Sequence, residues 1–152
     1  MTTLTAREAF EAYLAALTQR DLDALDALMH PDAEDAFPQS GERVRGAANL
    51  KAIIENYPEG APEDRGRERV EGAEDRWVTT PTFKVLRIEG TGNVFTAVHR
   101  AQYPDGSEWH VILIAEMRDG KAWRMQTYFA PSFEPPGWRA QWVEVDSPGS
   151  SS

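Results

Sequence analysis

Apolar residues recur at helical spacing near the start of the chain. Thr5 and Glu8 have the spacing of a capping box, in which each side chain accepts a hydrogen bond from the other residue's backbone. Apolar residues then follow every three to four positions, at Phe10, Tyr13, Leu14 and Leu17. This pattern predicts a helix from Ala6 to Gln19.

Two further helices follow by the same reasoning. Asp21 is placed to cap a second, shorter helix, and Pro31 prevents that helix from continuing. A third helix is predicted to begin at Gly46 and to stop before Pro58, with apolar residues again at helical spacing. Between the second and third helices we expect a short extended piece at Asp35–Pro38.

The second half of the chain changes to a period of two, which is typical of strands. Strands are predicted over residues 82–89, 94–103, 108–118 and 121–129. Turn sequences separate them, at Gly90-Thr91-Gly92-Asn93, Pro104-Asp105-Gly106 and Asp119-Gly120. Helices followed by an antiparallel meander predict an α+β fold, in one domain over residues 1–145 with a disordered tail over residues 146–152.

Charge and composition exclude several classes of function. Sixteen Lys and Arg against 25 Asp and Glu give a net charge of −9, so nucleic acid and anionic membranes are not expected partners. The chain has no cysteine and three histidines without metal-binding spacing, so neither a metal nor another cofactor is expected. It also lacks a long apolar segment and an apolar signal core, which favours a soluble, cytoplasmic protein.

Several short motifs together resemble a known family. They are a Tyr-bearing first helix, Met29-His30-Pro31-Asp32, Asp35-Ala36-Phe37-Pro38, Arg45-Gly46, and Met125-Gln126-Thr127-Tyr128-Phe129. Over about residues 5–130 the chain resembles the SnoaL-like group of the nuclear transport factor two-like superfamily, which includes ketosteroid isomerase. The resemblance implies a cone-shaped α+β barrel, in which a curved antiparallel sheet wraps around N-terminal helices and encloses a cavity. It also implies a dimer, but no particular reaction.

The isomerase's own catalytic residues are only partly present. Its general-base Asp falls on Phe37, and its second, protonated Asp falls near Ile112–Ala115, where there is no carboxylate. Tyr13 matches the tyrosine that donates a hydrogen bond to the substrate oxygen. The resemblance therefore implies the architecture of the isomerase without its chemistry.

Hairpin pairing predicts which side chains enter the cavity. A two-residue loop at Asp119-Gly120 places His110 and Glu116 on the same face as Met125, which the resemblance puts inside. The opposite face, Trp109, Val111, Leu113, Ala115 and Met117, is too apolar to face water. We therefore expect a second subunit to cover it, in a homodimer.

The preceding strand places His99 on its more apolar face, although a bulged loop at Pro104–Gly106 would reverse that assignment. The candidate catalytic residues are Tyr13, Asp35, His99, His110 and Glu116. The candidate ligand-binding residues are Phe37, Tyr57, Trp77, Phe83, Phe95, Trp123, Met125 and Phe129. An apolar cavity with a few convergent titratable groups is typical of a small-molecule site.

Three functions fit this pattern. The first is an acid–base enzyme without cofactor, an isomerase, cyclase, dehydratase or hydrolase acting on a small hydrophobic molecule. The second is a non-catalytic small-molecule-binding protein. The third is a dimeric interaction module whose pocket is filled by its own side chains or by Trp138 and Trp142, and in which the candidate residues serve packing and ion pairing. Trp138 and Trp142 fit either a lid over the cavity or a clasp on a neighbouring subunit, and the sequence leaves both open.

Overall fold

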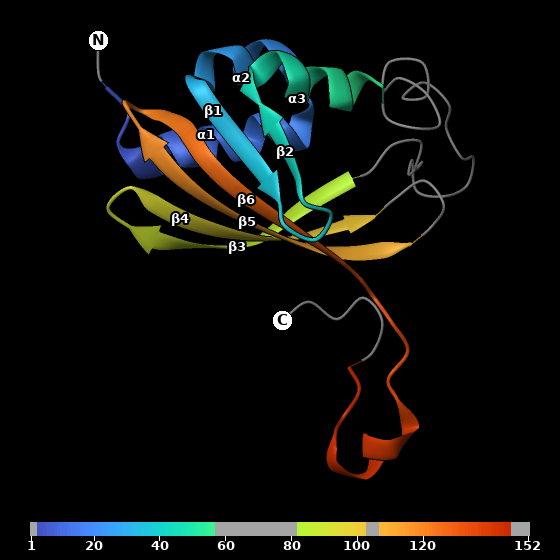
Figure 1. Ribbon diagram of the computed structural model, residues 1–152. Helices are drawn as coiled ribbons and strands as arrows, with labels where there is room; N and C mark the ends of the chain where they lie inside the picture. The colour runs from blue at the N-terminus through green and yellow to red at the C-terminus, as the bar shows by residue number, and fades with distance from the viewer. Residues whose placement is uncertain (1–2, 57–81, 103–106, 147–152) are drawn as a thin grey trace, which may run out of the picture.

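A computed structural model describes residues 3–56, 82–102 and 107–146. Within these ranges the helices are α1 (Ala6–Gln19), α2 (Leu22–Leu28), α3 (Gly46–Glu55) and the 3-10 helix η1 (Gly137–Trp142). The strands are β1 (Met29–Phe37), β2 (Glu42–Arg45), β3 (Thr82–Thr91), β4 (Val94–Gln102), β5 (Glu108–Arg118) and β6 (Lys121–Pro131). They form one curved sheet, and α1, α2 and α3 cover one of its faces (Figure 1). The predicted α+β fold is confirmed.

The sheet differs from the expected meander at one edge. Its strand order is β2-β1-β6-β5-β4-β3, and β1 pairs with β6 in parallel. The extended piece expected at Asp35–Pro38 is the end of the longer strand β1, which turns at Ser40 and Gly41 into the unpredicted strand β2. The sheet is therefore mixed, and its parallel pair brings Asp35 beside Met125.

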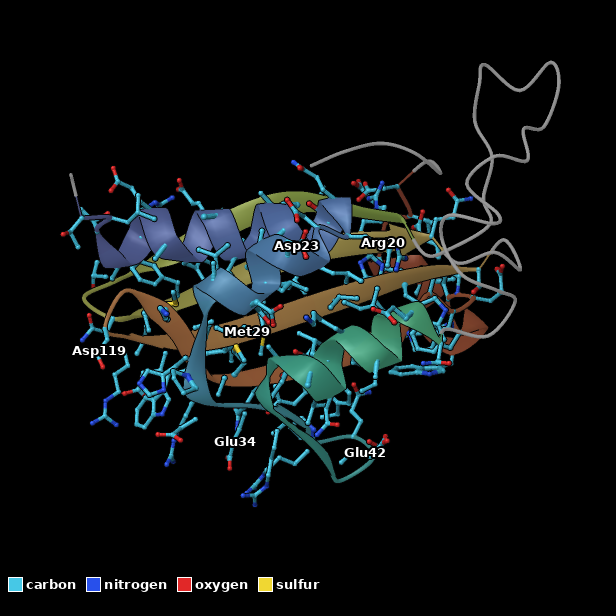
Figure 2. All side chains as sticks on the ribbon, turned by 90° about the horizontal axis from the view of Figure 1, so that it is seen from above. Arg20, Asp23, Met29, Glu34, Glu42 and Asp119 are labelled. Carbon is cyan, nitrogen blue, oxygen red and sulfur yellow. The ribbon has the colours of Figure 1, made fainter. Side chains whose placement is uncertain are left out.

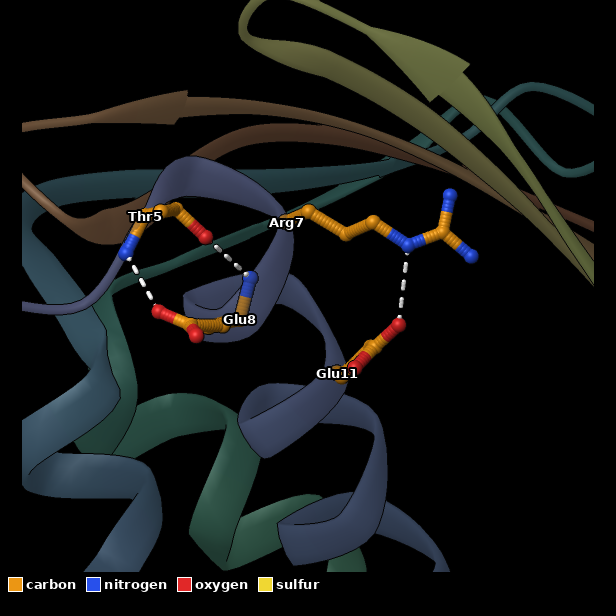
Figure 3. Close-up of polar contacts among 4 residues, drawn as sticks. All are labelled: Thr5, Arg7, Glu8 and Glu11. Atoms are coloured by element: carbon orange, nitrogen blue, oxygen red, sulfur yellow. Dashed lines mark hydrogen bonds and ion pairs between the residues drawn. The ribbon is translucent and has the colours of Figure 1, made fainter.

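The first helix forms as its sequence predicts. The Thr5 side chain accepts a hydrogen bond from the Glu8 N–H at 3.1 Å, and the Glu8 carboxylate accepts one from the Thr5 N–H at 2.8 Å (Figure 3). Arg7 pairs with Glu11 one turn further along, at 2.9 Å, on the exposed side of the helix (Figure 3). These local contacts fix where α1 begins, and so which of its faces meets the sheet.

The core lies between α1 and the inner face of the sheet, the face that the helices cover. Phe10 and Tyr13 are completely buried, and the Phe10 ring stacks on Phe95 of β4 at a centroid distance of 5.4 Å. Leu113, Ala115 and Met117 of β5 are buried in the same cluster. Burial of this apolar face against the sheet is the main stabilising contribution to the fold.

A β-bulge in β6 overturns the predicted orientation of β5. The Asp119-Gly120 turn forms as expected, with Arg118 opposite Lys121, but Met117 pairs with Ala122 while Glu116 pairs with Arg124. Trp123 is thus an extra residue, and it reverses the alternation of side chains for the rest of the β5–β6 pair. The prediction that His110 and Glu116 face inward is wrong, because both lie on the exposed outer face.

The same bulge removes the argument for a subunit on the other side of β5. Val111, Leu113, Ala115 and Met117 are buried beneath the helices of their own chain, and not under a second subunit. The homodimer stays a prediction that needs other support. On β4 the prediction holds, because His99 pairs with Val111 and is 4% exposed.

Several expectations fall at or beyond the limits of the described residues. Tyr57, Trp77 and the turn at Pro104–Gly106 lie outside them, as does the predicted disordered tail except for Asp146. No helix in the described part of the chain is long and apolar enough to cross a membrane.

Candidate functional site

A cavity of about 250 Å³ lies between the inner face of the sheet and the helices. Its lining comes from the end of α1, from α3, and from the inner faces of β1, β4, β5 and β6. The lining residues are Leu17, Thr18, Arg20, Asp35, Phe37, Leu50, Ile53, Ile54, His99, Val111, Leu113, Thr127 and Phe129. Figure 2 shows the helices from above and Arg20 at the end of α1. The walls are largely apolar, with a few polar groups among them.

Asp35 is held in the cavity wall by a threonine on the neighbouring strand. The Thr127 hydroxyl lies 2.9 Å from Asp35 Oδ1 and 3.1 Å from Oδ2, so it donates to the carboxylate across the β1–β6 pair. Both residues are buried, with exposed fractions of 6% for Asp35 and 7% for Thr127. The hydrogen bond connects residues 92 positions apart and fixes the orientation of the carboxylate.

Burial changes the acidity of Asp35. Loss of water around the carboxylate raises the pKa of Asp35 to about 6, and the hydrogen bond from Thr127 partly opposes that rise. A carboxyl with such a pKa can be ionised in one step of a reaction and protonated in the next near neutral pH. Asp35 is therefore suited to proton transfer.

His99 lines the same cavity from β4. Burial lowers the pKa of His99, while a hydrogen bond with the backbone of Val111 acts in the opposite direction. The imidazole is consequently neutral at pH 7, when one ring nitrogen carries a proton and the other has a lone pair. The prediction that Asp35 and His99 face the interior is confirmed by their positions in the cavity lining.

Tyr13 is completely buried in the core and is not part of the cavity lining. Among the described residues its hydroxyl has no hydrogen-bond partner. Burial, and then the negative charge of Asp35, raise the pKa of Tyr13 above its ordinary value. Tyr13 is therefore a core residue with a neutral hydroxyl that is influenced by the charge of Asp35, and its catalytic role stays a prediction.

The remaining two catalytic candidates lie on the opposite side of the sheet. His110 is exposed on the outer face, with Nε2 3.4 Å from the Ser132 hydroxyl. Glu116 is exposed near the β5–β6 turn. The structure therefore does not bring these two residues together with Asp35 and His99.

Two of the aromatic candidates line the cavity. Phe37 and Phe129 contact each other edge to face, with ring centroids 5.5 Å apart. Phe95 and Met125 are buried in the core and are absent from the cavity lining. The structure describes the backbone of Phe83 in β3 but not its side chain.

Trp123 lies away from the cavity, and its expected inward position is wrong. As the bulge residue, it is held between two cations, with Arg118 and Arg124 each 4.6 Å from the ring centroid. His30 meets the ring edge-on at 6.4 Å. These contacts stabilise Trp123 at the end of the sheet, so the role of the bulge is structural.

Sequence reasoning missed three polar cavity residues, Thr18, Arg20 and Thr127. Thr127 could have been found, because it alternates with Met125 and Phe129 on the inner face of the last strand and is the polar member of that set. Arg20 ends α1 in a left-handed conformation, with φ of 56°, which no local pattern specifies.

A metal site is not evident in the described residues. Within residues 3–56, 82–102 and 107–146, no three His, Asp or Glu side chains converge as the ligands of a metal ion would.

Comparison with known proteins identifies the family of this chain. A family model for the SnoaL-like domain matches residues 10–125. An NTF2-like protein of unknown function from Burkholderia xenovorans LB400 is 33% identical, with a TM-score of 0.69, covering 93% of this chain and 95% of its own. A search of curated proteins by sequence gave no significant match.

Two more distant structures share the fold. A candidate ketosteroid isomerase from Kribbella flavida is 20% identical, with a TM-score of 0.74, covering 97% of this chain and 93% of its own. An LEH-like epoxide hydrolase from M. tuberculosis is 21% identical, with a TM-score of 0.53, covering 82% of this chain and 81% of its own. The family model over residues 10–125 and the 33% identical Burkholderia protein show that the chain belongs to the SnoaL-like domain family of NTF2-like proteins.

Proposed function

We propose that the protein is an acid–base enzyme that transfers protons on a small hydrophobic molecule bound in the cavity, with Asp35 as the proton-transfer group. One observation carries the proposal. A buried carboxyl with its pKa raised to about 6 is oriented by Thr127 in the wall of an apolar cavity. A carboxylate kept from water is costly, and such perturbed groups concentrate at sites of chemistry.

The reaction follows from the protonation states. Above pH 6 the Asp35 carboxylate can take a proton from a carbon next to a carbonyl group, or from a water molecule that attacks the substrate. The electron pair released from the C–H bond moves onto the carbonyl oxygen. His99 lies on another strand of the cavity wall. Because its ring N–H is donated to the Val111 backbone, its other ring nitrogen can accept a hydrogen bond from a hydroxyl of the substrate or from the attacking water. The protonated Asp35 then returns the proton to a second carbon or to the leaving oxygen.

The cavity indicates the size and polarity of the substrate. At about 250 Å³ it lies just below the range of roughly 300–1,000 Å³ that is usual for ligand pockets. Leu17, Leu50 and Leu113 contribute apolar wall, which favours a compact hydrophobic molecule with one carbonyl or epoxide oxygen. The names of the two more distant relatives, a candidate isomerase and an epoxide hydrolase, support this range of chemistry.

Deuterium exchange tests the proposal with simple ketones in place of the natural substrate. A panel of small cyclic and aryl ketones is incubated with the protein in D₂O, and loss of the protons next to the carbonyl is followed by NMR. We expect wild-type protein to accelerate exchange for at least one ketone, and Asp35→Asn to lower that rate on the order of a hundredfold or more.

Glu116→Gln is the matched control, because it removes a carboxylate from the exposed outer face of the same sheet. Its exchange rate is expected to equal that of wild type. Equal rates for wild type and Asp35→Asn with every ketone that binds would contradict a catalytic role for Asp35.

A non-catalytic binding protein is the second candidate function. The observation that favours it is that, of the five proposed catalytic residues, only Asp35 and His99 line the cavity. Calorimetry distinguishes the two functions. A carrier binds a ketone in wild type and in Asp35→Asn without exchanging its protons, whereas an enzyme both binds it and exchanges them.

A further inference from the structure

The C-terminal segment exposes an unusual amount of apolar surface. Residues 133–146, here called the arm, carry large hydrophobic side chains that water surrounds. The exposed fractions are 77% for Phe133, 75% for Trp138, 71% for Trp142, 69% for Val145 and 43% for Val143. Isolated exposed apolar residues are ordinary, but five within one short segment indicate a surface that another molecule covers.

The arm has a defined shape that keeps it away from its own domain. Its last backbone tie to the sheet is the Ser132 N–H, which donates to the Glu108 carbonyl at 2.9 Å. Pro135 and Pro136 then restrict the backbone to extended conformations before η1 begins. No residue of η1 is buried, and the arm projects on the side of the sheet opposite the helices (Figure 1).

The position of the arm argues against a lid. The cavity lies on the helix side of the sheet, and none of its lining residues comes from the arm. With exposed fractions above 70%, Trp138 and Trp142 do not fill the cavity either.

The outer face of the sheet carries exposed apolar side chains, as the arm does. Val94 and Ile112 are 48% and 40% exposed there, beside the half-buried Val98 and Ile114. The β4–β5 register makes these four residues neighbours, since Val98 pairs with Ile112 and Thr96 with Ile114. They are called the outer patch below.

Charge does not oppose the pairing of the arm with the outer patch. Among its charged residues the arm has Glu134, Glu144 and Asp146 against Arg139. On the same outward side as the patch, β4 carries Arg100 and β6 carries Arg124, while β5 carries Glu108 and Glu116, and Arg100 lies 3.8 Å from Glu108. The arm therefore has a negative excess, whereas these four charges of the sheet balance, so the pairing rests on the apolar side chains.

We propose that the arm is a dimer clasp, and that it packs on the outer patch of a second copy of this chain. A two-fold axis allows both arms to be used at once, because each copy then offers one arm and one outer patch. The three aromatic side chains of an arm expose roughly 350–550 Å². Two arms and the surfaces that they cover would bury about 1,400–2,200 Å², which is the size of a stable interface.

Sedimentation of the full-length chain at micromolar concentration tests the clasp. We expect wild type to be a dimer, and the double variant Trp138→Ser, Trp142→Ser to be a monomer with an unchanged circular dichroism spectrum. Ile112→Asp places a charge in the outer patch and is expected to give a monomer as well. Glu144→Gln, a change at an exposed arm position, should leave the dimer intact.

Two results would overturn the clasp. One is a wild-type monomer, and the other is a dimer that persists in the Trp138→Ser, Trp142→Ser variant or in Ile112→Asp. The ketone exchange rate separates this proposal from the proposed function, since the clasp predicts the wild-type rate in the double Trp variant. Loss of exchange there, with the dimer intact, would show that the arm acts on the cavity and would also overturn the clasp.

Discussion

The two faces of the sheet carry the same kinds of titratable side chain in opposite surroundings. Asp35 and His99 are buried on the inner face, whereas Glu116 and His110 are exposed on the outer face. Burial raises the pKa of the inner carboxyl and lowers the pKa of the inner imidazole. The chemical use of a residue here therefore depends on the face that it occupies, and less on its type.

A single residue decides which face β5 presents. Because Trp123 is inserted into β6, the side chains of residues 109–117 that point inward are the apolar ones, and those that point outward include His110 and Glu116. The bulge thus supplies the apolar wall of the cavity and leaves the titratable residues of β5 in water. The predictions below test this difference between the faces.

The largest effect is expected from a charge placed on the inner face of β5, with the same charge on its outer face as the comparison. Leu113 is 3% exposed and Ile112 is 40% exposed, although they are adjacent. Leu113→Asp buries an unpaired carboxylate at a cost of several kcal/mol, comparable to the whole stability of a small domain. We expect Leu113→Asp to be unfolded and Ile112→Asp to be folded, as measured by circular dichroism and urea denaturation.

A β5–β6 pairing without the bulge would place Ile112 inside and Leu113 outside, and it therefore predicts the opposite outcome. If Ile112→Asp unfolds the chain and Leu113→Asp leaves it folded, the assignment of the two faces is wrong. Ile112→Asp also serves as the outer-patch variant of the dimer test, so one protein sample reports on both.

The pH dependence of the free energy of unfolding is expected to reveal the raised pKa of Asp35. Its pKa is about 6 in the folded chain and 3.8 as the ordinary value, so the folded state holds its proton more tightly. Between these values the folded state binds more protons than the unfolded state, and stability falls as pH rises. We expect wild type to lose roughly 3 kcal/mol relative to Asp35→Asn between pH 3.5 and pH 7, measured by urea denaturation.

The subtraction of Asp35→Asn is needed because His99 acts in the opposite direction. Its lowered pKa means that the unfolded state binds more protons below pH 6.5, so its contribution to stability is lost as pH falls. A constant difference between wild type and Asp35→Asn across this range would show that Asp35 is not desolvated.

A smaller effect, on the pH profile of ketone exchange, is expected from replacing Thr127, which donates a hydrogen bond to Asp35. Thr127→Val keeps the shape of the side chain but removes the hydroxyl, and with it the hydrogen bond that lowers the pKa of Asp35. The acidic limb of the ketone exchange profile should therefore move to higher pH, with a maximal rate within about tenfold of wild type. Thr96→Val, on the outer side of β4, is the matched control and should leave the profile unchanged.

Most of the fold could be predicted because its signals are local. The capping box of α1, the Asp21 cap of α2 and the Asp119-Gly120 turn each specify structure within a few residues. Strand β2 and the parallel β1–β6 pair could not be predicted in this way. The parallel pair depends on contacts between residues about 90 positions apart, and the polar turn before β2 gives no signal of a strand.

The positions of the site residues could be predicted only where strand alternation is regular. His99 was placed inside because it lies on the more apolar face of β4, and Asp35 because it alternates with Phe37. His110 and Glu116 were misplaced because the residues flanking Trp123 include neither a Gly nor a Pro that would mark the bulge. Contacts with Arg118 and Arg124 stabilise the Trp123 ring in the bulge, and these form only in the folded sheet.

Direct titration of Asp35 tests the central claim most closely. Carboxyl ¹³C chemical shifts are followed by NMR as a function of pH in wild-type protein, and Asp35→Asn identifies the resonance. We expect a pKa of about 6 for Asp35, which rises further in Thr127→Val. A pKa at or below the ordinary 3.8 would contradict the claim, because Asp35 would then be an ordinary carboxylate with no special capacity for proton transfer.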